Sequence, residues 1–290
     1  MDLRLCIKGK RQVRAVILDA GGVILYPNLD WIASQTAELA ARACRSSRPW
    51  RGAPGYGSGT PSRPCRGAPG YGSGARDEAA QFGAHVTRQD LFTGYYRTIH
   101  DLDLTPTMAP NGPAFTDLDM RVWFFTRLLG HAGLADQRCN DLGRTVAERA
   151  LQAFPRESDI YHWAMPGTAE RLQRLRDAGF LLGCASNNDD ALEAQLTSIG
   201  VRQLFGSLKD SGREGVAKPD PELLLRAARE LDVAPPHCLY VGDVDRVDGQ
   251  AARAAGMAFA LLDPLDQPRP TRPLCLPALD AILEHFAPML

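Results

Sequence analysis

Residues 13–27 read VRAVILDAGGVILYP, and this stretch determines the expected fold. Its apolar run, residues 16–18, ends at Asp19, and the glycines Gly21 and Gly22 follow. A continuous apolar run closed by a polar residue and glycines is typical of a buried parallel strand, and the glycines allow a tight turn close to a ligand. In open α/β sheets the ligand crevice lies at the carboxyl ends of the strands. Asp19 is therefore either a functional carboxylate at that edge or a residue that caps a turn.

The composition excludes several classes of protein. With 290 residues the chain is long enough for a large core with one inserted subdomain, and its net charge of −1 provides no overall attraction to nucleic acid or anionic membranes. The seven cysteines form no C-x-x-C pair, which favours a reducing compartment over a disulfide scaffold. The apolar part of the leader MDLRLCIKGKRQ is too short for a signal peptide, and no run approaches the roughly 18 apolar residues of a membrane span. We expect a cytoplasmic protein with no membrane partner.

The segment 28–155 has a helical pattern throughout. Four stretches in it carry apolar residues at helical spacing. These stretches are residues 28–43, 77–103, 118–129 and 142–154. Thr87 and Asp90, three residues apart, match a helix capping box, and residues 105–116 are rich in proline and predict a loop. We expect 28–155 to form an all-helical insert.

A tandem duplication interrupts this segment. Residues 47–59 read SRPWRGAPGYGSG and residues 62–74 read SRPCRGAPGYGSG, so that only Trp50 and Cys65 differ. Two copies are too few for a solenoid, and glycine, proline and serine cannot build a core. We predict a largely disordered surface loop at about 45–76, which costs little because closure entropy grows only logarithmically with loop length.

The same insert raises the question of a nucleic-acid partner. Residues 42–76 contain seven arginines and no acidic residue, and Tyr56 and Tyr71 are interleaved with them. Such a segment can bind nucleic acid through phosphate contacts and base stacking. We favour the interpretation that this segment is a solvent-exposed insertion without function, because most low-complexity loops are of that kind.

After Pro166 short apolar strands alternate with helices. We expect strands at 180–185, 207–209, 238–241 and 258–262, and helices at 168–178, 190–199, 221–231 and 248–255. This alternation predicts crossover connections and a doubly wound parallel sheet. The expected organisation is an α/β core made of residues 1–27 and 156–290, with the helical insert 28–155 after the first strand.

Polar side chains lie at or after the ends of the expected strands: Asp19, Ser186, Lys218, and Asp243 with Asp248. Since the strands are parallel, these ends share one edge and the side chains can converge. A carboxylate can attack phosphorus as a nucleophile, and carboxylate oxygens suit Mg²⁺, which neutralises charge on phosphoryl oxygens. A serine hydroxyl, backbone N–H groups and a lysine can bind the remaining oxygens. Asp245 is an alternative to Asp248, as a ligand or a helix cap.

Four strings carry a family resemblance. In order they are LDAGGV, ASNND, VAKPDPELLLRAAREL and YVGDVDRVDGQAARAAGM. They resemble the four motifs of the haloacid dehalogenase-like hydrolase superfamily over residues 13–28 and about 160–262, and the helical insert stands where that superfamily has a helical cap. The resemblance implies a Rossmann-type α/β core and phosphatase chemistry on a small phosphorylated substrate.

The resemblance also implies a role for each matching residue. Asp19 corresponds to the nucleophile, and Lys218 and Ser186 to the phosphate-binding residues, so that Asp19 and Lys218 are the catalytic candidates. Asn187, next to Ser186, is a candidate for substrate contact, although such a residue more often stabilises a turn. Mg²⁺ would be held by Asp19, the backbone carbonyl of Gly21, Asp243 and Asp248. In phosphatases of the superfamily the position of Gly21 usually carries a second aspartate that acts as general acid and base. Metal binding is expected to survive this replacement. Proton transfer, however, lacks its usual general acid and base, a group that typically raises the reaction rate about 10²–10⁴-fold.

Three functions therefore stay open at this point. The first is a Mg²⁺-dependent phosphatase acting through an aspartyl-phosphate. The second is a haloacid dehalogenase, a class that also lacks the second aspartate but works without metal and typically lacks the pair formed here by Gly242 and Asp243. The third is a non-catalytic or catalytically weak protein that binds a phosphorylated ligand, as the replacement at Gly21 would suggest.

Overall fold

A computed structural model provides the structure of the chain. It describes residues 6–7, 10–46, 86–105, 118–134, 138–271 and 273–289. Nearly all of the predicted loop at about 45–76, and of the proline-rich loop 105–116, lies outside these residues. Within the described ranges every helix is too short or too polar to traverse a lipid bilayer.

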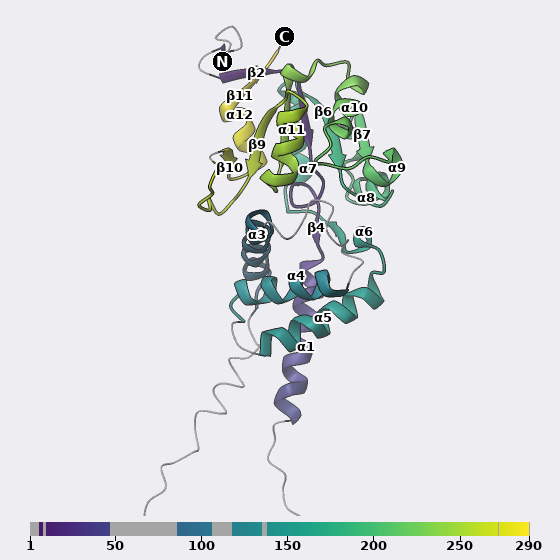
Figure 1. Cartoon of the computed structure of the whole chain (residues 1–290), viewed down its shortest axis with the longest axis vertical. Helices are drawn as coiled ribbons and strands as arrows, with labels where there is room; N and C mark the ends of the chain where they lie inside the picture. The colour runs from purple at the N-terminus through teal and green to yellow at the C-terminus, as the bar shows by residue number, and fades with distance from the viewer. Residues whose placement is uncertain are drawn as a thin grey trace, which may run out of the picture.

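A parallel sheet of six strands forms the centre of the core, in the order β10-β9-β8-β3-β6-β7 (Figure 1). The strands are β3 (Ala15–Leu18), β6 (Leu181–Ser186), β7 (Ser207–Asp210), β8 (Cys238–Gly242), β9 (Ala258–Leu262) and β10 (Leu274–Leu276). The chain winds from β3 in one direction through β6 and β7, and in the other through β8, β9 and β10. This topology confirms the predicted doubly wound α/β fold.

Strand β3 is apolar at every position because both of its faces are covered. Val16 and Leu18 belong to a core cluster that includes residues of α7 (Thr168–Asp177) and α8 (Leu192–Ser198). Ala15 and Ile17 belong to a second cluster with α10 (Glu222–Glu230) and α11 (Gln250–Ala254). All four side chains are fully buried. The continuous apolar run is thus the signature of a strand between two layers of helices.

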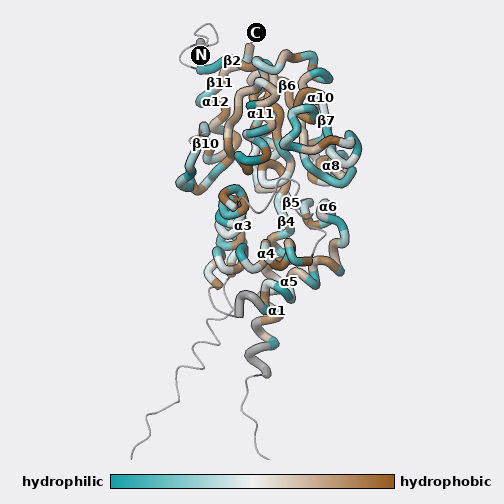
Figure 2. The backbone as a smooth tube through the Cα atoms, viewed as in Figure 1, coloured by the Kyte–Doolittle hydropathy of each residue, from teal (hydrophilic) through white to brown (hydrophobic). Residues whose placement is uncertain are grey.

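Four helices form the unit that we call the cap: α1 (Leu29–Ser46), α3 (Arg88–Leu104), α4 (Leu118–His131) and α5 (Arg138–Ala153). Their apolar side chains make a cluster of their own, apart from the two clusters of the sheet. Figure 2 shows hydrophobic and hydrophilic residues interspersed along these helices. Helix α3 begins with the predicted capping box, in which Thr87 Oγ1 accepts the Asp90 N–H at 3.1 Å and Asp90 Oδ2 accepts the Thr87 N–H at 2.8 Å.

The chain enters and leaves the cap through two adjacent strands. Strand β4 (Tyr26–Pro27) pairs antiparallel with β5 (Tyr161–Trp163), which follows the short helix α6 (Glu157–Ile160). The cap lies below the sheet in the view of Figure 1, joined to it by this pair. The cap therefore stands at the edge of the sheet to which Asp19 belongs.

Several elements differ from the sequence-based expectation. The helix expected from Asp190 begins at Leu192, because Asp190 adopts a left-handed conformation with φ of 67°. The helix expected over 248–255 starts earlier, with a π-helical turn η4 (Asp245–Gly249) before α11. Strand β10 was not expected, nor were the two-stranded sheet β4-β5 and a further sheet of three strands. That sheet has the order β1-β2-β11 and consists of Cys6–Ile7, Lys10–Val13 and Phe286–Pro288.

The remaining elements are short connections around the core. They are η2 (Arg202–Leu204), α9 (Ser211–Glu214), η3 (Pro235–His237), η5 (Leu279–Ala281) and α12 (Ile282–His285). Helix α9 follows β7 directly, and η5 and α12 precede the last strand. Because α9 follows the carboxyl end of β7, it lies at the same edge of the sheet as Asp19.

Candidate active site

Asp19 follows the last residue of β3 and is buried, with 8% of its surface exposed. Its backbone N–H donates to the carbonyl of Val241 on β8 at 2.8 Å. Its Oδ1 accepts the N–H of Ala20 at 2.7 Å, and its Oδ2 lies 2.9 Å from Lys218 Nζ. Both carboxylate oxygens are thus oriented, one by the backbone and one by an ammonium group.

Lys218 is almost completely buried and uses all three donors of its ammonium group. Its Nζ contacts Asp19 Oδ2, Asp248 Oδ1 at 2.7 Å and the hydroxyl of Tyr240 at 2.8 Å. Tyr240 in turn donates to the carbonyl of Ala185 at 2.9 Å. An ammonium with three partners in one place acts as a fixed point charge between the two carboxylates.

Asn187 holds the backbone of the loop that carries this lysine. Its Nδ2 donates to the Lys218 carbonyl at 2.9 Å, and its Oδ1 accepts the Lys218 N–H at 2.8 Å. These two bonds give Asn187 a role in positioning Lys218, and its predicted contact with substrate stays a prediction. Ser186, the last residue of β6, is buried, and its hydrogen bond to Asp19 lowers the pKa of that carboxyl.

Three carboxylates converge at the edge of the sheet. Asp19, Asp243 and Asp248 are all buried, and each offers an oxygen within 4.8 Å of the others. Asp248 Oδ2 also accepts the N–H of Val244 at 3.1 Å. Asp245 does not join them, because its two oxygens bind Arg253 and Thr271, each at 2.7 Å. Asp245 and Asp248 of η4 were alternative candidates for a metal ligand. Asp248 belongs to the cluster of carboxylates, and Asp245 does not.

Two glycines make this convergence possible. Gly22 has a φ of +69°, and a Cβ added there would stand 1.7 Å from Asp243 Oδ2. A Cβ on Gly242 would stand 2.4 Å from the carboxyl carbon of Asp248. Any side chain at either position would push a carboxylate out of the cluster, so these two glycines are part of the site.

The cluster carries more negative than positive charge. Burial raises the pKa of Asp19 to about 6, while Lys218 lowers it. Burial, with Asp248 and Asp19 as neighbours, raises the pKa of Asp243 well above its usual value. Burial lowers the pKa of Lys218, but the two carboxylates it contacts raise it more, so its pKa lies above the usual value and the ammonium stays charged. Three carboxylates with one ammonium fit a divalent cation with hard oxygen ligands, such as Mg²⁺.

Gly21 differs from the other two glycines. A Cβ added to Gly21 would have Tyr161 Cε1, at 3.9 Å, as its nearest neighbour, which is an ordinary van der Waals distance. Its φ lies outside the left-handed region. Packing and backbone conformation therefore leave room for a Cβ at the position where the resemblance implies an aspartate.

The site contains two tyrosines that the sequence analysis did not identify. Tyr240 lies in the middle of β8 and contacts Lys218, and its only signal is a hydroxyl in an otherwise apolar strand. Tyr95 lies on α3 of the cap, and its buried hydroxyl donates to Asp243 Oδ2 at 3.4 Å. No spacing could have revealed Tyr95, because it approaches Asp243 only when the cap packs on the core.

Fold and site together define a hydrolase with an aspartate at the end of a central strand. A model of the haloacid dehalogenase-like hydrolase family matches residues 13–256. The chain therefore belongs to this family. It is 31% identical over 194 residues to the mouse haloacid dehalogenase-like hydrolase domain-containing protein 3, covering 62% of this chain and 76% of that one.

Two further comparisons concern phosphatases. A phosphoglycolate phosphatase of Nitrosospira multiformis is 38% identical over 116 residues, which are 38% of this chain and 51% of that protein. The crystal structure of a HAD phosphatase from Thermococcus onnurineus covers 93% of this chain and 96% of its own, at 18% identity and a TM-score of 0.48. Among the relatives of the chain are thus proteins named as phosphatases.

Proposed function

We propose that the protein is a Mg²⁺-dependent phosphatase that hydrolyses a small phosphorylated metabolite through an aspartyl-phosphate. The observation that carries this proposal is the buried cluster of Asp19, Asp243 and Asp248, with the Lys218 ammonium 2.9 Å from one carboxylate and 2.7 Å from another. The phosphoglycolate phosphatase relative supports the choice of phosphate as the group transferred.

In this function each residue of the site has its own role in the reaction. An oxygen of Asp19 attacks phosphorus, the bond between phosphorus and the leaving oxygen breaks, and that oxygen takes up a proton. Water then attacks the aspartyl-phosphate, releases phosphate and regenerates the carboxylate. Lys218 binds the phosphoryl group through the positive charge of its ammonium, which Asp19 and Asp248 hold in place. Ser186 binds a phosphoryl oxygen, and Asn187 fixes the backbone of Lys218. Mg²⁺, held by the three aspartates and the Gly21 carbonyl, would neutralise charge on the phosphoryl group.

A dehalogenase is the alternative from another class. It would use Asp19 on carbon and would need no cation. The close approach of Asp243 and Asp248 to the nucleophile favours phosphate, because it concentrates negative charge that a cation can offset. The lack of a side chain at Gly21 is compatible with either chemistry and also with a weak or non-catalytic protein that binds a phosphorylated ligand.

A single set of assays separates these functions. Purified protein is incubated with a panel of phosphorylated metabolites, and separately with short 2-haloacids, each in Mg²⁺ and in EDTA. Phosphate release that EDTA abolishes and Mg²⁺ restores is the expected result. Halide release that persists in EDTA would establish the dehalogenase and exclude the proposal. Binding of phosphorylated compounds without turnover would leave only the ligand-binding function.

A further inference from the structure

One helix of the cap contacts the segment that carries Asp243 and Asp248. Near the middle of α3 the Tyr95 hydroxyl donates to Asp243 Oδ2 at 3.4 Å, and both side chains are buried. The neighbouring Tyr96 donates to the carbonyl of Gly22 at 2.8 Å. A Cβ on Gly22 would come within 2.8 Å of the Tyr95 hydroxyl, so this glycine leaves space for the tyrosine as well as for Asp243.

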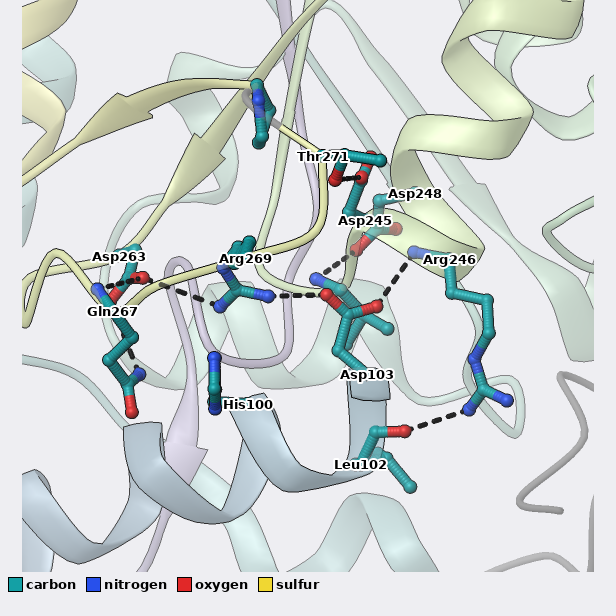
Figure 3. A network of polar contacts seen from close by, with 12 residues as sticks. His100, Leu102, Asp103, Asp245, Arg246, Asp248, Asp263, Gln267, Arg269 and Thr271 are labelled. Carbon is teal, nitrogen blue, oxygen red and sulfur yellow. Dashed lines mark hydrogen bonds and ion pairs between the residues drawn. The ribbon is translucent and has the colours of Figure 1, made fainter. Parts of the chain in front are cut away.

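The C-terminal end of α3 contacts the same segment at Arg246 (Figure 3). Arg246, which lies between Asp243 and Asp248 in the chain, donates from its guanidinium to the carbonyls of Leu102 and Thr105, each at 2.9 Å. The Arg246 backbone N–H donates to Asp103 Oδ1 at 2.8 Å. The last turn of a helix leaves carbonyls without the usual intrahelical donor, and Arg246 donates to two carbonyls there. The Leu102 carbonyl also accepts the Thr105 N–H at 3.4 Å.

The loop after β9 completes the attachment (Figure 3). Arg269 forms buried ion pairs with Asp103 of α3 and with Asp263, and its side chain is only 4% exposed. Gln267 donates to the carbonyl of Tyr96 at 3.2 Å, and His100 bonds the carbonyl of Pro268 at 2.9 Å. Helix α3 is therefore fixed to the core along its C-terminal half, in the position that brings Tyr95 to Asp243.

We propose that α3 is a positioning element for the carboxylates of the cation site and that Tyr95 is its principal positioning residue. The inference rests on the proposed function, since it assumes that Asp243 binds a cation. Hydrogen bonds to a ligating carboxylate fix its orientation, and their loss typically costs about 10–100-fold in metal affinity. Because the donor comes from the cap, docking of the cap and binding of Mg²⁺ favour each other, and this coupling is reciprocal.

The experiment compares Mg²⁺ binding by calorimetry in the wild-type protein and in Tyr95→Phe. Phenylalanine keeps the ring that packs against Tyr26, Tyr96 and Phe124, and removes only the hydroxyl. We expect Mg²⁺ affinity to fall about 10-fold, at the lower end of the range because the bond is 3.4 Å long. The matched control is Thr98→Val, which removes a buried hydroxyl of the same helix that donates to the Gly94 carbonyl at 2.8 Å. The control should bind Mg²⁺ as the wild type does.

A second readout separates positioning from mere stability. Mg²⁺ should slow hydrogen exchange of the α3 amides in the wild-type protein and in Thr98→Val, and should slow it less in Tyr95→Phe. A purely structural tyrosine would change the melting temperature but neither the affinity nor this Mg²⁺-dependent difference. Should Tyr95→Phe not fold, Arg246→Met tests the same coupling from the other end of the helix, and it too should bind Mg²⁺ more weakly.

The outcomes are distinguishable. Wild-type affinity in folded Tyr95→Phe, or in folded Arg246→Met when the first variant does not fold, overturns the role of α3 and leaves the phosphatase proposal standing. A wild-type protein that binds no Mg²⁺ overturns the proposed function, and the inference about α3 fails with it.

Discussion

Replacement of Gly21 by aspartate tests the step in which this chain departs from the usual phosphatase pattern. A Cβ at this position meets nothing closer than Tyr161 Cε1 at 3.9 Å, and the backbone is not left-handed. We therefore expect Gly21→Asp to fold, because neither packing nor backbone conformation excludes a side chain there. Position 21 is two residues from Asp19, and negative charge near a carboxyl favours the protonated form that a general acid needs.

The expected gain depends on the leaving group. Alkyl phosphates need a proton on the departing oxygen, so Gly21→Asp should hydrolyse them faster by up to the roughly 10²–10⁴-fold of general acid catalysis. Aryl and acyl phosphates have acidic leaving groups and should gain far less. If activation of water limits the wild-type enzyme instead, the leaving group should hardly matter and phosphorylated Asp19 should accumulate.

The assay is phosphate release from one alkyl and one aryl phosphate at saturating Mg²⁺, with Gly21→Ala as the matched control. Alanine supplies the same Cβ without the carboxyl and should leave both rates unchanged. Mg²⁺ affinity should also be nearly unchanged in both variants, because the carbonyl at this position is kept. A Gly21→Asp protein that folds, binds Mg²⁺ and gains no activity on any alkyl phosphate would refute the reasoning. Another group would then already supply the proton.

Three further predictions concern the cation site, the attachment of the cap and the insert. Asp243→Asn should weaken Mg²⁺ binding strongly in a calorimetric titration, and an unchanged titration would count decisively against the site. Arg269→Met should destabilise the protein by about 3–5 kcal/mol, because it leaves the buried carboxylates of Asp103 and Asp263 without their cation. A loss below about 1 kcal/mol in a denaturant titration would contradict this. Deletion of residues 46–75 should leave the melting temperature and any phosphatase activity intact, since a sequence rich in glycine, proline and serine is expected to add little stability. A fall of many degrees would make the insert structural.

The core of the fold could be predicted because its signals are local. Strand β9 (Ala258–Leu262) has the bounds expected from its apolar run, and the capping box of Thr87 and Asp90 is present as expected. Strand β10 (Leu274–Leu276) and the strands β1, β2 and β11 were missed because they have two to four residues each. Strands this short exist by pairing with a neighbour that is distant in sequence, as β2 does with Phe286–Pro288.

The residues of the site also fall into those with a local sequence signal and those that depend on contacts between distant segments. Asp19, Ser186, Asp243 and Asp248 were identifiable because parallel strands bring their carboxyl ends to one edge, and the structure places them there together. Their catalytic roles stay predictions until they are tested. The contribution of Tyr95 was not identifiable, since it depends on how a separate helical unit docks, and nothing in the local sequence of α3 encodes that orientation.

The pairing of β4 with β5 has a consequence for the order in which the chain folds. Ala15 of β3 pairs with Leu181 of β6 across the whole helical segment, which makes this contact one of long range in sequence. Pro27 pairs with Tyr161, and this link leaves residues 19–25 between β3 and the junction and residues 164–180, with α7, between the junction and β6. Once the cap has folded, the loop to be closed between β3 and β6 is therefore shorter, and its entropic cost is correspondingly lower. We expect the cap to form first and the central strands to pair afterwards, so destabilising the cap should slow refolding of the sheet.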